Sequence, residues 1–224
     1  MEHASIAAFA RFSLELLALG APAELVGQAA RAMADETEHA RSCFALATRY
    51  GGKRVGPSAL SIQGCLDDSD PVAIFSNAFR EACVGETLAA MEAQEAAQHA
   101  QEPTLRATLS RIAEDEARHA ELGWRFAAWM LETSEPKLRA ELVHAMQALA
   151  LREFEPRPVR HQAESLEVRT LSQHGLLPDS ARAALRESAL RDVVAPCIAS
   201  LLDAHGGQPS TLAETRIELP PSSA

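Results

Sequence analysis

The sequence predicts an all-α protein, built as a four-helix bundle with one long crossover and followed by C-terminal helices. Ala and Leu dominate the apolar residues of the 224-residue chain, whereas aromatic residues make up only 4%. This composition is typical of helices that pack closely through small side chains. Few stretches alternate β-branched and polar residues, so almost no sheet is expected. Gly and Pro residues also divide the first part of the chain into four long segments, joined by a short, a long and a short connection.

The first two predicted helices form a hairpin. One runs from the start of the chain to about Leu19, and the next from Pro22 to about Tyr50. Gly20 just past one helix and Pro22 at the start of the next are the usual positions of these residues at helix ends. Residues 51–69, which begin with two glycines, then form the long crossover.

The next two predicted helices form a second hairpin. Asp70 can cap a helix that has Pro71 at its first position and that continues to about Ala100. Pro103 opens the fourth helix, which runs to about Thr133. One long crossover between two hairpins excludes the simple up-down topology, in which every loop is short.

Further helices are predicted after the bundle. One runs from about Pro136 to Phe154, and another from about Asp179 to Gly206, with a kink expected at Pro196. Prolines at 156 and 158 break the chain between them.

Three regions result from this pattern. Residues 1–133 form the bundle, and residues 134–207 form additional helices that pack on it. Residues 208–224 are rich in Pro, Ser and Thr, and they are expected to form a disordered tail.

Charge and composition also exclude several classes of protein. The formal net charge of -10 argues against nucleic acid or an anionic membrane as a partner. No apolar run of about 18 residues and no secretory signal is present, so we expect a cytoplasmic protein. None of the four cysteines forms a C-x-x-C pair, which argues against a zinc knuckle or a rubredoxin-like iron site.

One five-residue pattern, D-E-x-x-H, occurs twice, in the second and in the fourth predicted helix. The copies are Asp35-Glu36-Thr37-Glu38-His39 and Asp115-Glu116-Ala117-Arg118-His119. Residues three apart share one face of a helix, so each Glu projects beside its His. Glu-x-x-His pairs on two facing helices are typical of two-metal centres in helical bundles. Glu36, His39, Glu116 and His119 are therefore candidate metal ligands.

A centre of this kind needs one more carboxylate from each of the two partner helices. Residues equidistant from a short loop between antiparallel helices lie at the same height. Reflection through the loop near residue 102 places Glu86 level with the second motif, and reflection through the loop near residue 20 places Glu2 level with the first. Glu81 lies more than a turn beyond Glu86 and is a weaker choice, and Glu15 is too close to its loop.

The charges of this set balance two divalent ions. Glu2, Glu36, Glu86 and Glu116 supply four negative charges, which two Fe(II) ions would compensate. Without such compensation, four carboxylates in a bundle core would suffer repulsion and severe desolvation.

The aspartates that precede the two glutamates are candidate partners of the histidines. A metal-bound His commonly donates its second ring N–H to a carboxylate. We therefore expect Asp35 to hold His119, and Asp115 to hold His39, across the helix pair. Glu38 and Arg118 are expected beside the site or on the surface.

On these residues, the region 1 to about 133 resembles the ferritin-like di-iron carboxylate superfamily. The D-E-A-R-H copy is most similar to the pattern of bacterial multicomponent monooxygenases and ribonucleotide reductase small subunits. The resemblance implies two iron ions, with manganese or a mixed Mn/Fe pair as alternatives. It also implies that Glu36 and Glu116 bridge the metals and that Glu2 and Glu86 are mainly terminal ligands.

The first functional hypothesis is a di-iron oxidase or oxygenase that uses O2, an external electron donor and an unknown small organic substrate. The alternatives are a ferroxidase or rubrerythrin-like peroxide scavenger, and a non-catalytic ferritin-like interaction module. Tyr50, the only tyrosine, lies about 16 Å along its helix from His39, which argues against a reductase-type tyrosyl radical. Glu2 stands at the start of its helix, where fraying would weaken metal binding. The helical hairpins are compatible with a homodimer.

Overall fold

The computed structural model describes residues 2–67, 70–155 and 166–205 and, for Glu2 and residues 166–168, the backbone alone. All regular structure within these ranges is helical, which confirms the predicted all-α class. No helix in the described part of the chain is long and apolar enough to cross a membrane. The predicted tail at 208–224 and most of the predicted break after Phe154 lie outside the described residues.

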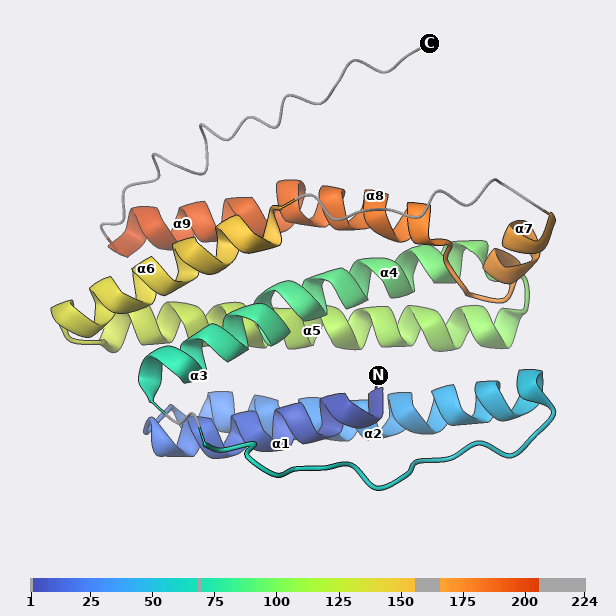
Figure 1. Cartoon of the computed structure of the whole chain (residues 1–224), viewed down its shortest axis with the longest axis horizontal. Coiled ribbons are helices and arrows are strands. Elements are labelled where there is room, and N and C mark those ends of the chain that lie inside the picture. Colours follow the sequence, from blue (N-terminus) through green and yellow to red (C-terminus); the bar gives the residue numbers. More distant parts are fainter. Residues whose placement is uncertain (1, 68–69, 156–165, 206–224) are drawn as a thin grey trace, which may run out of the picture.

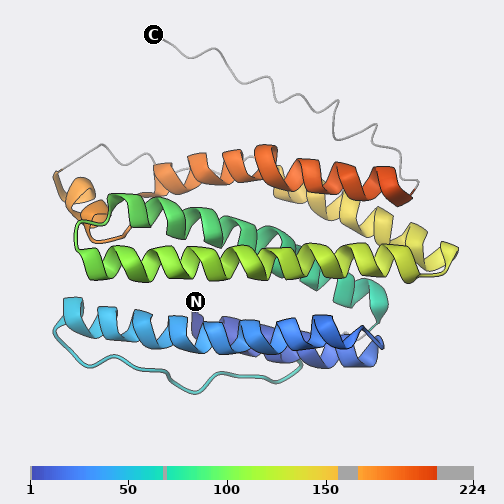
Figure 2. The ribbon, with the colours of Figure 1, turned by 180° about the vertical axis from the view of Figure 1, so that it is seen from behind.

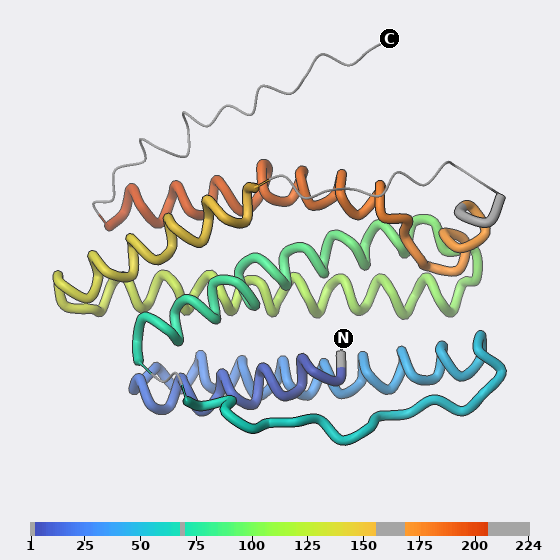
Figure 3. The backbone as a smooth tube through the Cα atoms, viewed as in Figure 1, coloured from blue at the N-terminus to red at the C-terminus, as the bar shows by residue number. Residues whose placement is uncertain are grey.

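The first hairpin consists of α1 (Glu2–Ala18) and α2 (Ala23–Gly51), which pack along each other (Figure 1). Gly20 makes the turn between them with a φ of 69°, a conformation that L side chains rarely adopt. Gly52 ends α2 in the same left-handed region, with a φ of 63°. The crossover then runs along the outside of this hairpin (Figure 3).

The second hairpin starts with α3 (Pro71–Ala78), and its other arm is α5 (Pro103–Thr133). Asp70 caps α3 as predicted, since its Oδ1 accepts hydrogen bonds from the backbone N–H groups of Val72 and Ala73. The prediction of one continuous helix from Pro71 to Ala100 is wrong in detail. The π-helical segment η1 (Phe79–Gly85) separates α3 from α4 (Glu86–His99).

Close backbone packing accompanies the π segment. Gly123 of α5 lies so near η1 that a Cβ atom there would be 2.7 Å from Ala82 Cβ and 2.8 Å from the backbone nitrogen of Cys83. A π segment amounts to one extra residue in a turn, which rotates the next helical residues by about 100° relative to a regular α-helix. Glu86 comes directly after η1, and its N–H bonds the carbonyl oxygen of Glu81. The π segment therefore sets the direction of the Glu86 side chain.

The C-terminal part adds helices on the far side of the second hairpin. These are α6 (Pro136–Glu153), α7 (Leu166–Gln173), α8 (Asp179–Ala189) and α9 (Ala195–His205), with the π segment η2 (Leu190–Val194) between the last two. The sequence did not predict α7, because eight residues give too little periodicity. Near Pro196, where a kink was expected, the helix contains the π segment η2, which ends two residues before the proline.

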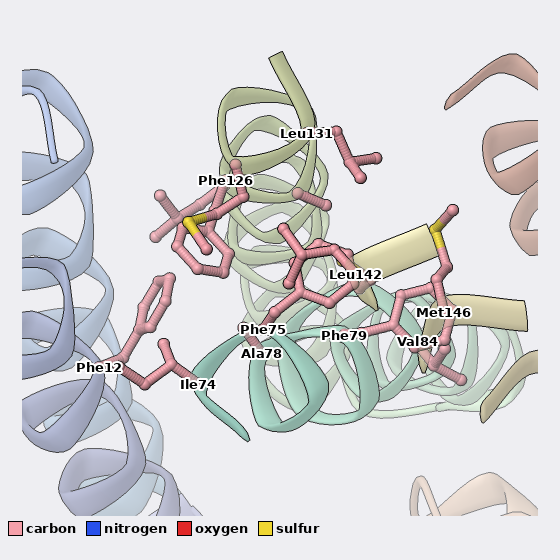
Figure 4. Close-up of a cluster of buried hydrophobic side chains, with 14 of the residues drawn as sticks. Phe12, Ile74, Phe75, Ala78, Phe79, Val84, Phe126, Leu131, Leu142 and Met146 are labelled. Atoms are coloured by element: carbon pink, nitrogen blue, oxygen red, sulfur yellow. The ribbon is translucent and has the colours of Figure 1, made fainter. Parts of the chain in front are cut away.

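The helices form three layers in both views: α1 and α2, then α3 to α5, then α6, α8 and α9 (Figures 1 and 2). An apolar core joins the layers near the loop that connects α1 and α2 (Figure 4). Phe12 of α1 meets Phe126 of α5 edge-on at 5.1 Å between ring centroids, and Leu142 and Met146 of α6 are fully buried in the same core. Polar residues replace apolar ones about one turn beyond this core, between α2 and α5.

We expect Gly123→Ala to destabilise the protein by about 1–3 kcal/mol, because the added methyl group would collide with the backbone of η1. Urea unfolding measures the change. Gly27→Ala on α2 is the matched control, since its Cβ would meet only Arg31 Nη1 at 3.8 Å. That variant should gain about 0.5–1 kcal/mol, as expected for Gly→Ala within a helix. If both substitutions changed the free energy of unfolding in the same direction, the close approach of η1 to Gly123 would be contradicted.

Candidate metal centre

The two D-E-x-x-H motifs meet between α2 and α5. These helices run in opposite directions (Figure 2), and they contact each other. The side chains of Glu36, His39, Glu116 and His119 are almost completely buried, with exposed fractions of 1% to 3%. Four ionisable groups in such an environment require mutual compensation or a bound cation.

The four inner side chains form a reciprocal pattern. Glu36 presents Oε1 to His119 Nδ1 at 3.3 Å and Oε2 to His39 Nδ1 at 3.7 Å. Glu116 likewise presents Oε2 to His119 Nδ1 at 2.9 Å and Oε1 to His39 Nδ1 at 3.4 Å. Each carboxylate therefore directs one oxygen to each ring, and the ring centroids lie 6.1 Å apart. Buried carboxylate and imidazole donors that are directed at one another in this way could hold a bound cation.

Two inner atoms provide a direct test of the fit to metal. Glu36 Oε2 and His39 Nδ1 are buried and have no hydrogen-bond partner in the part of the chain that the structure describes. Buried polar atoms without a partner are uncommon and require an explanation. Both atoms face the interior of the cluster, where a cation bound between the rings would satisfy them.

Glu86 lies with this group, as predicted from its distance to the loop near residue 102. One ligand atom from each of Glu36, Glu86, Glu116 and His119 lies within 4.8 Å of the others. Glu86 is only partly buried, and it lines a small cavity between α1 and η1. Glu86 is therefore the most exposed of the clustered side chains.

The outer nitrogen of each histidine faces an aspartate of the opposite helix. His39 Nε2 lies 2.9 Å from Asp115 Oδ2, and His119 Nε2 lies 3.4 Å from Asp35 Oδ2. This crossed pairing is the one expected from the sequence. It directs both Nδ1 atoms inward, because a carboxylate on Nε2 favours the tautomer that keeps a proton there.

Arg118 connects the two aspartates, a contact that the sequence did not predict. Its Nη2 donates to Asp115 Oδ1 and lies 3.5 Å from Asp35 Oδ2, and its Nη1 donates to the carbonyl oxygen of Glu114. The spacing of Asp115 and Arg118 by three residues on one helix was the available signal. The corresponding residue of the first motif, Glu38, pairs instead with Arg41 on the surface.

Other carboxylates near the cluster have different partners. Glu81, the weaker ligand candidate, accepts a hydrogen bond from Arg11 of α1. Glu15 is buried, 3.2 Å from Arg11 Nε, and burial raises the pKa of its carboxyl above the ordinary value. Glu2 begins α1, but its side chain lies outside the described residues, so its role as a ligand stays a prediction.

Charge coupling strongly shifts the titration of the inner groups. Burial disfavours a charged His39 ring, but the carboxylates of Glu116, Glu36 and Asp115 outweigh burial and raise its pKa to about 11. Burial likewise disfavours a charged His119 ring, but the carboxylates of Glu116 and Glu36 outweigh burial and raise its pKa to about 10.

The carboxylates shift in opposite directions. Burial and the neighbouring Glu116 raise the pKa of Glu86 well above its ordinary value. For Glu116, contacts with His119 and His39 outweigh burial and lower the pKa to about 2. Without metal, both histidines therefore retain their protons at neutral pH, and metal binding requires the release of these protons.

Comparisons of the chain with protein-family models, with curated proteins and with solved structures found no match. The residues and geometry of the cluster are therefore the basis on which function is inferred.

We expect the stability of the metal-free protein to fall as pH rises from 7 to 10. The folded-state pKa values of His39 and His119, about 11 and about 10, exceed the ordinary value of 6.5. Their contribution is therefore fully present below pH 6.5 and is lost as pH rises through the folded-state values. Chemical unfolding after treatment with a chelator measures this dependence.

Variants at His39 and at an exposed histidine separate this effect from general alkaline destabilisation. His39→Gln should flatten the decline between pH 7 and 10, whereas His99→Gln should not, because His99 lies exposed on α4 beside Glu95. Parallel pH profiles for the wild type and His39→Gln would contradict the assignment.

Proposed function

We propose that the chain is a ferritin-like di-iron carboxylate protein that activates O2 as an oxidase or oxygenase. The observation that carries this proposal is the reciprocal arrangement in which Glu36 and Glu116 each direct one oxygen to His39 and one to His119. The ferritin-like assignment also draws on the two hairpins and the long crossover between them.

We propose two ions rather than one, because two Glu-x-x-His pairs on facing helices are typical of two-metal centres in helical bundles. Two ions would each take one histidine and share the two glutamates. Glu86 would then complete the coordination of the ion beside His119, since its ligand atom groups with that ring. Glu2 is the proposed terminal ligand of the other ion.

The donor set suits iron and also manganese, alone or in a mixed pair, because carboxylate and imidazole ligands bind both. Bound iron would supply the electrons and open coordination positions that O2 activation requires. The chain supplies the rest. Glu36 and Glu116 neutralise the ions, and Asp35 and Asp115 hold the two histidines in the tautomer that leaves Nδ1 free.

The cavity beside Glu86 favours small reactants. It measures about 20 Å³ and is lined mainly by apolar residues, among them Phe9, Phe12 and Ala82. This volume holds a molecule of about the size of water, and O2 and hydrogen peroxide are of similar width. The small volume is a specific observation in favour of a second candidate function, ferroxidase or rubrerythrin-like peroxide scavenging. A larger organic substrate would require η1 or α1 to move.

We expect the wild-type protein to bind about two Fe(II) ions per chain in an anaerobic titration, as a centre of this type does. The Glu36→Ala, Glu116→Ala double variant should bind none with comparable affinity, because both bridging ligands are lost. Elemental analysis measures the content, and circular dichroism verifies that the variant is folded. Glu38→Ala is the control, because Glu38 is exposed on α2 and pairs with Arg41. Equal iron in the wild type and the double variant would overturn the proposal.

The reaction of the iron-loaded protein distinguishes the functions. An oxidase or oxygenase should consume O2 in proportion to an added reductant and organic substrate. A ferroxidase should continue to oxidise Fe(II) beyond the first two equivalents, and a scavenger should remove hydrogen peroxide catalytically. Tightly bound iron with none of these reactions would indicate a non-catalytic ferritin-like module.

A further inference from the structure

A second polar site lies between α2 and α5, on the outer side of His119. It is a half-open pocket of about 310 Å³, within the range of small-molecule sites. Gln28, Arg31 and Asp35 line it from α2, and Arg118, His119 and Glu121 line it from α5. The pocket is far larger than the cavity beside Glu86, and the proposed metal chemistry does not use it.

Arg31 supplies a cation without a carboxylate partner among the described residues. It lies exposed on α2, with its Nη1 near Gly27. Neighbouring arginines on α5 differ in this respect, since Arg118 pairs with Asp115 and Arg125 pairs with Glu24 at 2.7 Å. A guanidinium has five N–H donors in a planar fork that matches an oxyanion. Arg31 is therefore available to bind an anionic group of a ligand.

Gln28 supplies an unsatisfied polar atom one turn before Arg31. Its Oε1 is buried and has no hydrogen-bond partner in the described part of the chain. Such an acceptor is costly to leave unpaired, and a ligand that brings a donor would satisfy it. Gln28 and Arg31 are three residues apart, so both lie on the face of α2 that lines the pocket.

The remaining charges restrict the chemistry of the ligand. Asp35 of α2 and Glu121 of α5 place one carboxylate on each side of the pocket, and Asp35 is already held by Arg118 and His119. These carboxylates would repel a dianion such as phosphate, but they would accept hydrogen bonds from an ammonium or hydroxyl group. The pocket thus combines one free cation with several acceptors among the residues that the structure describes.

We propose that this pocket binds a small organic molecule that carries one carboxylate and one hydrogen-bond donor group, of the class of α-amino and α-hydroxy acids. The carboxylate binds Arg31, and the donor group faces Gln28, Asp35 and Glu121. The ligand contacts the Nε2 side of His119 and not the Nδ1 side that faces the proposed metals. The pocket is therefore separate from the proposed metal ligands other than His119, and it adjoins the centre through Asp35, Arg118 and His119.

Titration of the metal-free, isotope-labelled protein followed by NMR tests this proposal. The probes are L-serine, which has a carboxylate, an ammonium and a hydroxyl group, and acetate, ethylammonium and inorganic phosphate, which each have only part of this chemistry. We expect saturable shifts at residues 28–35 and 118–122 with serine, and at least tenfold weaker binding of the other three. Absence of saturable shifts in these segments would overturn the proposal, as would acetate or phosphate binding as tightly as serine.

Variants test the two named contacts. Arg31→Gln and Gln28→Leu should each weaken the binding of serine about tenfold or more, whereas Arg41→Gln should not, because Arg41 pairs with Glu38 elsewhere on α2. Unchanged binding in Arg31→Gln would overturn the proposal. The Glu36→Ala, Glu116→Ala variant should still bind serine. The outcome therefore does not depend on whether the chain binds iron.

Discussion

The interaction on which the structure depends is charge compensation between two buried carboxylates and two buried imidazoles at the interface of α2 and α5. Two carboxylates in this interior require opposite charge, and the rings of His39 and His119 each contact both Glu36 and Glu116. In the metal-free state protons on the rings supply the compensating charge. The proposed metal ions would take over this compensating role.

This polar interface is possible because the apolar core lies elsewhere. Phenylalanine and leucine side chains join the three layers near the loop between α1 and α2, so packing there holds the two hairpins together. The ionisable residues start about one turn further along α2. Close approach of η1 to Gly123 then fixes the partner helix beside them. The apolar core and the ionisable cluster therefore occupy different segments of the same helices.

Much of this arrangement could be predicted from the sequence, because it depends on helical periodicity and on short loops. The three-residue spacing placed Glu36 with His39, and Glu116 with His119, on one face each. The short loop between α4 and α5 fixed the height of Glu86, and antiparallel helices explain the crossed contacts of Asp35 and Asp115.

Features that depend on distances between helices could not be predicted in this way. A π segment such as η1 does not change the hydrophobic pattern of the sequence clearly. The interruption of the helix before Glu86 was therefore not predicted. The hydrogen bonds of Arg118 and the unpaired state of Arg31 among the described residues depend on which side chains of a neighbouring helix come within reach. The position of the Glu2 carboxylate depends on the first turn of α1, which the sequence pattern does not constrain.

The connection made by Arg118 has a consequence for how the two halves of the centre differ. The inner ligands are nearly symmetric, but only one motif has an arginine at its fourth position. Arg118 donates to Asp115, which is almost fully buried and lies 2.9 Å from His39. Asp35 is more exposed and lies 3.4 Å from His119. It lines the half-open pocket between α2 and α5. The two histidines are therefore held unequally, and the two halves of the proposed centre would differ in their affinity for a metal ion.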